Sequence, residues 1–267
     1  MDIPEFIKSC FPRFFRTALK KSLFDLRQRN FKPYLTKKNF DGVAFDFWIG
    51  DTDGRHYYDL NERLWVEEMR FVRSHMIEPG DVVLDCGANH GFTAMLFSRW
   101  AGDTGKVVAF EPLPRNCDIL AKNIELNGIK NVIVERKAVG AKRGRIRIDG
   151  VSDSTVIFSN QGIEVEVTCL DDYAHLKPAL IKIDVEGFEY QVLQGAERIL
   201  SQRPRLALEI HGDKLAKYGA SVEDILEAIG VNGYKLWIQW NDIERPEEYD
   251  SRRAIAGRRV HLFCIPK

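Results

Sequence analysis

Val82-Val-Leu-Asp-Cys-Gly-Ala-Asn-His-Gly91 is the most informative stretch of the sequence. Its first residues are apolar and mostly β-branched, which is typical of a strand buried on both faces. Gly87 and Gly91 bracket a turn where the backbone can approach a ligand without an intervening Cβ. Residues 92–97 read as the start of a helix. Strand, glycine turn and helix together predict a parallel α/β sheet that binds a nucleotide-like ligand at the carboxyl ends of its strands.

The spacing of the glycines differs from that of a dinucleotide-binding loop. The pattern is Asp-x-Gly-x-x-x-Gly, which lacks the middle glycine that lets a pyrophosphate sit against the backbone. Residues 107–110 read as a second strand that ends in Glu111, 24 residues after Gly87. An acidic residue at that place accepts hydrogen bonds from both hydroxyls of a ribose. A ribose without a pyrophosphate suggests S-adenosylmethionine, and we expect Asp85 to organise the turn around its charged methionine end.

The composition limits the classes of protein to consider. A chain of 267 residues is long enough for one large α/β domain with a full core. Its 39 basic and 39 acidic side chains balance, so no global field favours nucleic acid. The five cysteines are scattered and form no Cys-x-x-Cys pair, which suits a reducing compartment. No apolar run approaches the ~18 residues of a membrane-spanning helix. We therefore expect a cytoplasmic protein.

The first 75 residues differ in character from the rest. Residues 1–38 hold ten Lys or Arg against three Asp or Glu, and residues 11–29 fit an amphipathic helix with a basic flank. Such a helix either caps the main domain or makes peripheral contact with the inner face of a membrane. Residues 40–60 look irregular or β-rich, with a turn at Asp53-Gly54, and Asn61 is placed to cap a helix over residues 62–76. We expect a helical and irregular extension, 1–75, packed on a catalytic domain, 76–267.

Strands and helices alternate after residue 82, which implies a mostly parallel sheet with helices on both faces. Seven strands are expected, the last of them antiparallel, and residues 241–258 read as a loop before it. Residues 144–149, 155–158 and 163–168 break the alternation and predict a small antiparallel β insertion near the site. The strands of the predicted core sheet are centred on residues 82–84, 107–110, 132–134, 179–184, 206–211, 235–239 and 260–265.

Polar residues end four of the buried strands. They are Asp85, Glu111, Asp184 and Glu209, the last followed by His211. In an open α/β sheet the ligand lies above these strand ends, so acids at all four favour a functional site over separate structural roles. Lys182 lies inside an apolar strand, where a lone ammonium would carry a large desolvation cost. We expect it to pair with Asp184 or Glu186.

Several motifs together resemble the FkbM family, S-adenosylmethionine-dependent methyltransferases with the Rossmann-like class I fold. The most specific is Ile181-Lys-Ile-Asp-Val-Glu-Gly-Phe-Glu189, and the resemblance covers about residues 80–211. The other motifs are Asp85-Cys-Gly-Ala-Asn-His-Gly91, Phe110-Glu-Pro112, Lys137-Ala-Val-Gly140 and Thr168-Cys-Leu-Asp171. The resemblance implies O-methylation of a hydroxyl on a sugar, a glycolipid or a polyketide-like molecule.

The resemblance also implies roles for single residues. It assigns the methionine end of the cofactor to Asp85, Gly87, Asn89 and Gly91, the ribose to Glu111, and the adenine to Ala138 and its neighbours. It places Asp184 beside the transferred methyl group. These roles agree with the positions of the same residues at the predicted strand ends.

The chemistry of the acceptor requires a group that removes a proton, because a sugar hydroxyl is a weak nucleophile. Asp184 is the first candidate for this base and His211 the second, while Lys182 would orient the acceptor or tune Asp184. Alternatively, Asp184, Glu209 and His211 would hold one divalent cation, Mg²⁺ or Mn²⁺, that activates the hydroxyl.

The sequence gives weaker support to three other functions. The glycine spacing disfavours a hydride-transferring dehydrogenase. A methyltransferase-fold binding protein without catalysis is disfavoured because Asp85, Glu111 and Asp184 are all present. Methylation of nitrogen or of nucleic acid would want a basic, aromatic groove near the site, whereas the basic residues cluster at the N-terminus. We expect a small-molecule or glycan acceptor and no specific nucleic acid.

Overall fold

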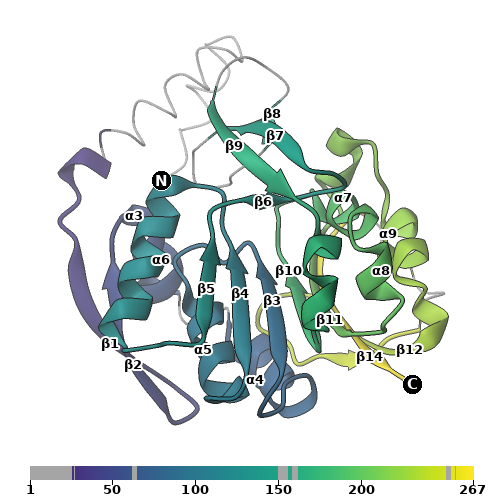
Figure 1. The fold of residues 1–267 in the computed structure, drawn as a ribbon, viewed down its shortest axis with the longest axis horizontal. Helices are drawn as coiled ribbons and strands as arrows, with labels where there is room; N and C mark the ends of the chain where they lie inside the picture. Colours follow the sequence, from purple (N-terminus) through teal and green to yellow (C-terminus); the bar gives the residue numbers. More distant parts are fainter. Residues whose placement is uncertain are drawn as a thin grey trace.

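The computed structural model describes residues 26, 28–61, 65–149, 156–157, 162–250, 254–255 and 257–267. Its largest element is an eight-stranded sheet of order β13-β12-β14-β11-β10-β3-β4-β5 (Figure 1). The strands are β3 (Val82–Cys86), β4 (Lys106–Phe110), β5 (Val132–Glu135), β10 (Leu180–Ile183), β11 (Arg205–His211), β12 (Tyr234–Gln239), β13 (Glu247–Glu248) and β14 (Arg259–Pro266).

The seven expected core strands are all present in this sheet, and the five from β11 to the edge strand β5 are parallel. The last strand, β14, is antiparallel to both of its neighbours, as predicted. The prediction of a loop over residues 241–258 was wrong in part, because β13 pairs with β12 and adds a short eighth strand at the edge. The charged Glu247 and Glu248 gave no strand signal in the sequence, since an exposed two-residue edge strand needs no apolar face.

Helices cover both faces of the sheet, because alternate residues of each buried strand point to opposite sides. Leu84 packs into the hydrophobic cluster under α7, α8 and α9, whereas Val83 packs into the cluster with α4 and α5. In Figure 1, α7, α8 and α9 lie at the right of the view and α6 lies at the left. The helices are α3 (Thr52–Arg55), η1 (His56–Leu60), α4 (Val66–His75), α5 (Phe92–Ala101), α6 (Pro114–Leu126), η3 (Leu170–Leu176), α7 (Glu189–Gln194), α8 (Glu197–Leu200), η4 (Leu215–Tyr218), α9 (Val222–Ile229) and η5 (Val231–Gly233).

Among the helices in the described part of the chain, none combines the length and the apolarity that crossing a bilayer demands.

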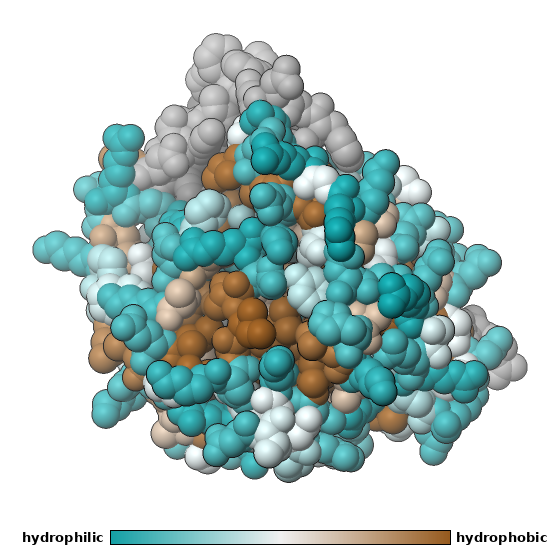
Figure 2. Space-filling model, viewed as in Figure 1, coloured by the Kyte–Doolittle hydropathy of each residue, from teal (hydrophilic) through white to brown (hydrophobic). Residues whose placement is uncertain are grey.

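In the space-filling view, apolar side chains near the centre of the face lie over the strands of the sheet, with hydrophilic side chains around them (Figure 2).

A second, smaller sheet lies beyond the end of the large sheet where β5 leads into β6 (Figure 1). It has the order β6-β9-β7-β8 and is built from β6 (Ala138–Val139), β7 (Gly144–Ile148), β8 (Val156–Ile157) and β9 (Ile163–Thr168). Strands β7 to β9 form the predicted antiparallel insertion. Strand β6 was not predicted, and it pairs with β9 in parallel.

The N-terminal region forms a hairpin of β1 (Tyr34–Phe40) and β2 (Val43–Ile49). The turn lies at Asp41 and Gly42, both with positive φ, rather than at the predicted Asp53-Gly54, which lies at the centre of helix α3. The helix expected over residues 62–76 begins at Val66 in the structure, and residues 62–64 lie outside the described part. The predicted helix over residues 11–29 also lies outside it, apart from helical residues 26, 28 and 29.

Two asparagines of α6 attach this hairpin to the core. The Asn123 side chain accepts a hydrogen bond from the Trp48 backbone N–H at 2.6 Å and donates one to the His90 carbonyl at 2.9 Å. One turn later, the Asn127 amide exchanges two hydrogen bonds with the backbone of Asp46, at 2.9 and 2.7 Å. Amide side chains at i and i+4 thus satisfy the free edge of β2 as a neighbouring strand would.

We expect Asn123→Ala to lower the free energy of unfolding by about 2–4 kcal/mol, because the fully buried amide leaves the Trp48 N–H and the His90 carbonyl without partners. Urea titration at equilibrium measures the change. Asn39→Ala is the matched control, since that amide caps only an exposed turn, and its cost should stay within about 0.5 kcal/mol. Equal costs for the two variants would contradict the proposed anchoring.

Candidate active site

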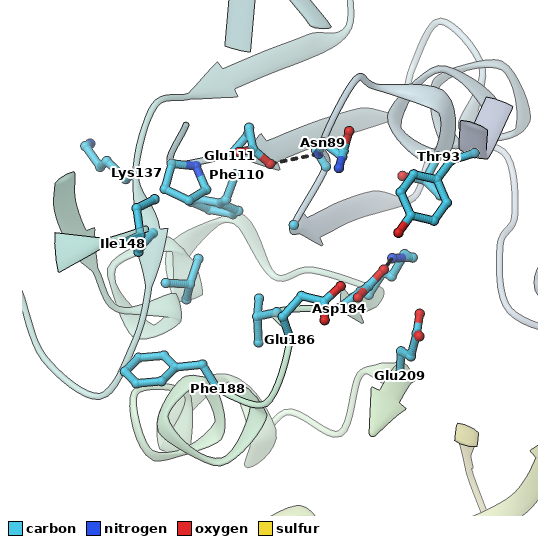
Figure 3. A pocket seen from close by; sticks show the side chains of 18 of the residues that line it. Asn89, Thr93, Phe110, Glu111, Lys137, Ile148, Asp184, Glu186, Phe188 and Glu209 are labelled. Carbon is cyan, nitrogen blue, oxygen red and sulfur yellow. Dashed lines mark hydrogen bonds and ion pairs between the residues drawn. The ribbon is translucent and has the colours of Figure 1, made fainter. Parts of the chain in front are cut away.

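A pocket lies at the carboxyl ends of β3, β4, β10 and β11. Figure 3 shows Glu111 and Asn89 on one side of it and Asp184, Glu186 and Glu209 on the other. The residues that line it are Tyr57, Tyr58, Trp65, Gly87, Ala88, Asn89, Thr93, Phe110, Glu111, Pro112, Lys137, Ala138, Val139, Ile146, Ile148, Lys182, Asp184, Val185, Glu186, Phe188, Glu209, Asp242, Arg259 and His261.

The glycine turn is closely packed between two strand ends. The Gly87 and Ala88 backbone N–H groups both donate to the Phe110 carbonyl at 3.0 Å. Gly87 has a φ of +87°, and a Cβ built on it would lie 1.9 Å from the Asp184 carbonyl oxygen. Only glycine fits this position, because both the backbone conformation and the space exclude a side chain. Gly91 ends the turn with a φ of +90°, immediately before α5.

Glu111 is held at the end of β4 by three donors. Its Oε2 accepts from the Asn89 backbone N–H at 2.9 Å, and its Oε1 accepts from the Leu113 backbone N–H at 2.9 Å and from Asn116 at 3.2 Å. The side chain is buried, and burial outweighs these hydrogen bonds and raises the pKa of Glu111 to about 7. Glu111 thereby connects the glycine turn to the second strand while still lining the pocket.

Two buried oxygens at this end of the pocket have no hydrogen-bond partner among the described residues. They are Asn89 Oδ1, on a residue that lines the pocket, and Asp85 Oδ1, on a fully buried residue of β3 that does not belong to the lining. The other oxygen of Asp85 accepts from the Thr93 hydroxyl at 2.7 Å, and burial raises the pKa of the carboxyl. Since buried polar atoms are nearly always satisfied, the Asn89 oxygen fits a ligand that brings a donor.

Apolar side chains from both sheets form the other wall of this end. Ala138 lies on β6 of the small sheet and lines the pocket together with Phe110, Ile148 and Phe188. Phe110 is buried at the end of β4, while Ile148 comes from the β insertion. The insertion therefore lines the pocket, as its expected place near the site implied.

Lys182 and Asp184 form the predicted ion pair at the end of β10, with Lys182 Nζ 3.1 Å from Asp184 Oδ2. Burial would raise the pKa of Asp184, but the Lys182 ammonium and the His211 imidazolium outweigh it and lower the pKa to about 2. Burial would conversely lower the pKa of Lys182, and the carboxylates of Asp184 and Asp85 raise it instead. Asp184 is therefore an ionised carboxylate at neutral pH.

His211 is enclosed by carboxylates. Its Nδ1 lies 2.8 Å from Glu189 Oε1, and its Nε2 lies 3.3 Å from Glu186 and 3.4 Å from Glu209. Burial alone would lower the pKa of His211, but the hydrogen bond to Glu189 and the surrounding carboxylates raise it to about 9. The ring is therefore an imidazolium at neutral pH, and it does not belong to the pocket lining.

The potential metal ligands differ in one residue from the set expected from the sequence. Among the described residues, Asp184, Glu186 and His211 bring one potential ligand atom each within 4.8 Å of the others. Glu186 takes the place expected for Glu209, whose Oε1 forms an ion pair with Arg259 at 3.0 Å. Burial raises the pKa of Glu209 to about 7.

The sequence did not identify two groups of pocket residues. Tyr57, Tyr58 and Trp65 come from the N-terminal region, while Arg259 and His261 come from the last strand. Nothing in their local sequence marks them, since they reach the pocket only through tertiary packing and through the pairing of β14 with β11. Phe188, by contrast, lies within the most specific motif and was available to sequence reasoning.

Comparison with known proteins decides the family. The family model described as "Methyltransferase FkbM domain" matches residues 85–236, more than half of the chain, and spans the glycine turn, Glu111 and Asp184. The chain belongs to the FkbM methyltransferase family. It is thus a methyltransferase, and the cofactor of FkbM enzymes is S-adenosylmethionine.

One curated relative and two solved structures illustrate the similarity. The hexuronic acid methyltransferase AglP of Haloferax volcanii is 27% identical over 190 residues, which are 68% of this chain and 72% of that protein. The FkbM methyltransferase structure from Methylobacillus flagellatus is 20% identical, with a TM-score of 0.46, and covers 69% of this chain. The match spans only 43% of that longer chain. Fibrillarin of Aeropyrum pernix with bound S-adenosylmethionine is 13% identical with a TM-score of 0.47, over 86% of this chain and 82% of its own.

The FkbM pocket fits S-adenosylmethionine by its own chemistry. The cofactor carries an ammonium, a ribose diol and an apolar adenine face. The unpartnered oxygen of Asn89 suits the ammonium, the buried carboxyl of Glu111 suits the diol, and the wall around Ala138 suits the adenine. The pocket thus offers acceptors for the donors of the cofactor and an apolar surface for its base.

We expect Gly87→Ala to destabilise the FkbM fold by about 3–5 kcal/mol, because the added methyl group would clash with the Asp184 carbonyl as well as strain φ. Gly128→Ala isolates the strain alone, since Gly128 has a φ of +61° and nothing within 4 Å of the added Cβ. It should cost about 1–2 kcal/mol. Urea unfolding of both variants measures the difference, and a smaller loss in Gly87→Ala than in Gly128→Ala would refute the steric argument.

Proposed function

We propose that this enzyme methylates a hydroxyl group of a sugar, with a hexuronic acid residue as the first candidate acceptor. The observation that carries the proposal is the ionised Asp184 carboxylate beside Lys182 in the pocket, since such a group can accept the proton of an attacking hydroxyl. The name of the Haloferax volcanii relative supports the choice of a hexuronic acid. Acceptors on glycolipids and polyketide-like molecules are consistent with the same chemistry.

The roles proposed for the cofactor-binding residues follow the layout of the pocket. Asp85, Gly87, Asn89 and Gly91 would hold the methionine end of S-adenosylmethionine. Glu111 would accept hydrogen bonds from the ribose hydroxyls, and Ala138 with its apolar neighbours would contact the adenine. S-adenosylmethionine supplies an electrophilic methyl group on a sulfonium, so positioning of the acceptor oxygen provides much of the rate.

Asp184 is the proposed base, and Lys182 is its positioning residue. The 3.1 Å ion pair fixes the carboxylate and helps to keep it charged at neutral pH. Loss of the acceptor proton to this carboxylate would accompany formation of the new C–O bond. A carboxylate of low pKa is a weak base, so its effect depends on geometry more than on proton affinity.

His211 suits a different role from that of a base. With a pKa of about 9 it already carries a proton at neutral pH, and both ring nitrogens face carboxylates. We propose that it holds Glu186 and Glu209 at the edge of the pocket. Glu209, whose pKa is about 7, becomes the second candidate for the base because it lines the pocket.

A divalent cation at Asp184, Glu186 and His211 is the alternative way to activate the hydroxyl. It would have to displace protein cations, since Lys182 pairs with Asp184 and Lys214 pairs with Glu186. It would also have to displace the proton of His211, because a ligating imidazole must be neutral. The ion pairs therefore favour a bare carboxylate as the proposed mechanism.

We expect the affinity for S-adenosylhomocysteine to rise about tenfold between pH 6 and pH 8, as Glu111 with its pKa of about 7 loses its proton. The ionised carboxylate is the stronger acceptor for two ribose hydroxyls, so protonation below pH 7 weakens binding. Calorimetric titration at several pH values measures this slope. In Glu111→Gln the affinity should be lower and its pH dependence flatter than in the wild type, and equal slopes in the two proteins would remove Glu111 from the ribose site.

We expect the wild-type enzyme to convert methyl α-D-glucuronide and S-adenosylmethionine into a methyl ether and S-adenosylhomocysteine. Asp184→Asn keeps the shape of the side chain and removes its charge, so turnover should fall by about 10²–10⁴-fold. The dissociation constant of S-adenosylmethionine should change less than threefold, where a tenfold change corresponds to about 1.4 kcal/mol. Mass spectrometry of the sugar product together with S-adenosylhomocysteine release measures both quantities.

Asp81→Asn is the matched control, since Asp81 also forms an ion pair, with Arg205 at 2.7 Å, but is not among the pocket-lining residues. It should turn over normally. Normal turnover by Asp184→Asn would instead move the proposed base to Glu209. Chelator treatment tests the metal alternative, because lost activity that Mg²⁺ or Mn²⁺ restores would replace the bare-carboxylate mechanism.

A further inference from the structure

Tyr58 contributes a phenol to the pocket from outside the sequence motifs. It lies in η1, a single turn of π-helix in the N-terminal region, and only 6% of the residue is exposed. It nevertheless lines the pocket together with the glycine turn, Glu111 and Asp184. Isolated π-helical turns occur frequently at functional sites, because they shift one side chain out of the regular helical position.

The aromatic ring of Tyr58 is fixed beside the glycine turn. It stacks on Phe92 with 5.7 Å between ring centroids and on Trp65 with 5.9 Å. The His90 ring lies 5.7 Å away. His90 and Phe92 flank Gly91, so the phenol is packed against the end of the turn that leads into α5.

Asp51 holds the segment that carries Tyr58. Its carboxylate is 2% exposed and accepts from the Gly54 backbone N–H at 2.8 Å, at the start of α3. It also lies 3.0 Å from Arg115 Nε on α6 and 3.5 Å from His90 Nε2 in the glycine turn. The N-terminal segment is thereby tied to the turn itself and to the helix that follows Glu111.

The Tyr58 hydroxyl makes no hydrogen bond within the part of the chain that the structure describes, and it is not among the fully buried polar atoms of that part. Burial raises the pKa of its phenol far above the ordinary value, so the group is neutral and able to donate. Its charged neighbours are Lys182, Asp184, Glu111 and Asp85, which surround the junction of the strand ends. A donor without a protein partner on the wall of a pocket fits a ligand that offers an acceptor.

We propose that the Tyr58 hydroxyl donates a hydrogen bond to the carboxylate at the methionine end of S-adenosylmethionine. The ring lies against the glycine turn, where that end of the cofactor belongs, rather than against the adenine wall. A neutral donor suits a carboxylate, whereas the ammonium needs an acceptor such as the side-chain oxygen of Asn89. This inference rests on the cofactor site of the proposed function and not on the identity of the acceptor. The N-terminal segment is then a part of the cofactor site.

Calorimetric titration of the full chain with three ligands tests the proposal. Tyr58→Phe keeps both stacking contacts and removes only the hydroxyl. It should weaken S-adenosylmethionine and S-adenosylhomocysteine alike, by about 10- to 100-fold, as expected for a hydrogen bond to a charged group. Its affinity for 5′-methylthioadenosine, which lacks the amino-acid end, should stay within twofold of the wild type. That ligand also reports an intact adenosine site in the variant.

Tyr234→Phe is the matched control, because the Tyr234 hydroxyl also has no partner among the described residues but lies buried in the core away from the pocket lining. It should bind all three ligands as the wild type does. Unchanged affinity of Tyr58→Phe for S-adenosylhomocysteine would overturn the proposal, and so would an equal loss for 5′-methylthioadenosine. A loss confined to S-adenosylmethionine would also overturn it, since the hydroxyl would then face the methyl group. None of these measurements needs an acceptor, so they stand even if methyl α-D-glucuronide is not a substrate.

Discussion

A buried ammonium at the centre of the sheet constrains the whole site. Lys182 is 3% exposed on β10, directly beside Asp85 of β3, and two residues before Asp184. An unpaired charge there would carry a large desolvation cost, so carboxylates must stand on its own strand and on the next one. Their positions bring together the glycine turn after β3 and the acidic turn after β10. These two turns also pack closely, since Gly87 approaches the Asp184 carbonyl so nearly that no side chain fits at position 87.

The site is made of two electrostatic environments. At the end with Asp85, Glu111 and Asn89, burial dominates, and the carboxyl pKa values rise. At the end with Asp184, the Lys182 ion pair helps to lower the pKa of that carboxyl to about 2, whereas burial raises the pKa of the nearby Glu209 to about 7. The acids of the site therefore differ in charge at one pH, because Glu111 and Glu209 can release protons near neutrality while Asp184 stays charged.

The N-terminal region packs against the part of the chain that carries the site. The hairpin strand β2 is hydrogen-bonded through its backbone to Asn123 and Asn127, and Phe47 and Ile49 share a hydrophobic cluster with Val83 and Leu96. We infer that the described residues before the first core strand fold together with the catalytic part of the chain. A boundary at residue 75 would then mark a change in the character of the sequence and not a boundary between two folding units.

The sequence by itself determined the local elements and their ends. Strands β3, β4, β10 and β11 are buried on both faces, so each is recognisable in the sequence as an apolar run. Side chains two residues apart in a strand lie on the same face, which placed Lys182 and Asp184 together, and their 3.1 Å contact confirms it. Carboxyl ends of parallel strands meet, so the acids could be grouped without a structure. Only the tertiary structure decided which partners those groups have: Glu186 rather than Glu209 as the third potential metal ligand with Asp184 and His211, a protonated His211, and Tyr58 within the pocket. The physical reason is that burial and pairing depend on residues far apart in the chain, and no local pattern records them.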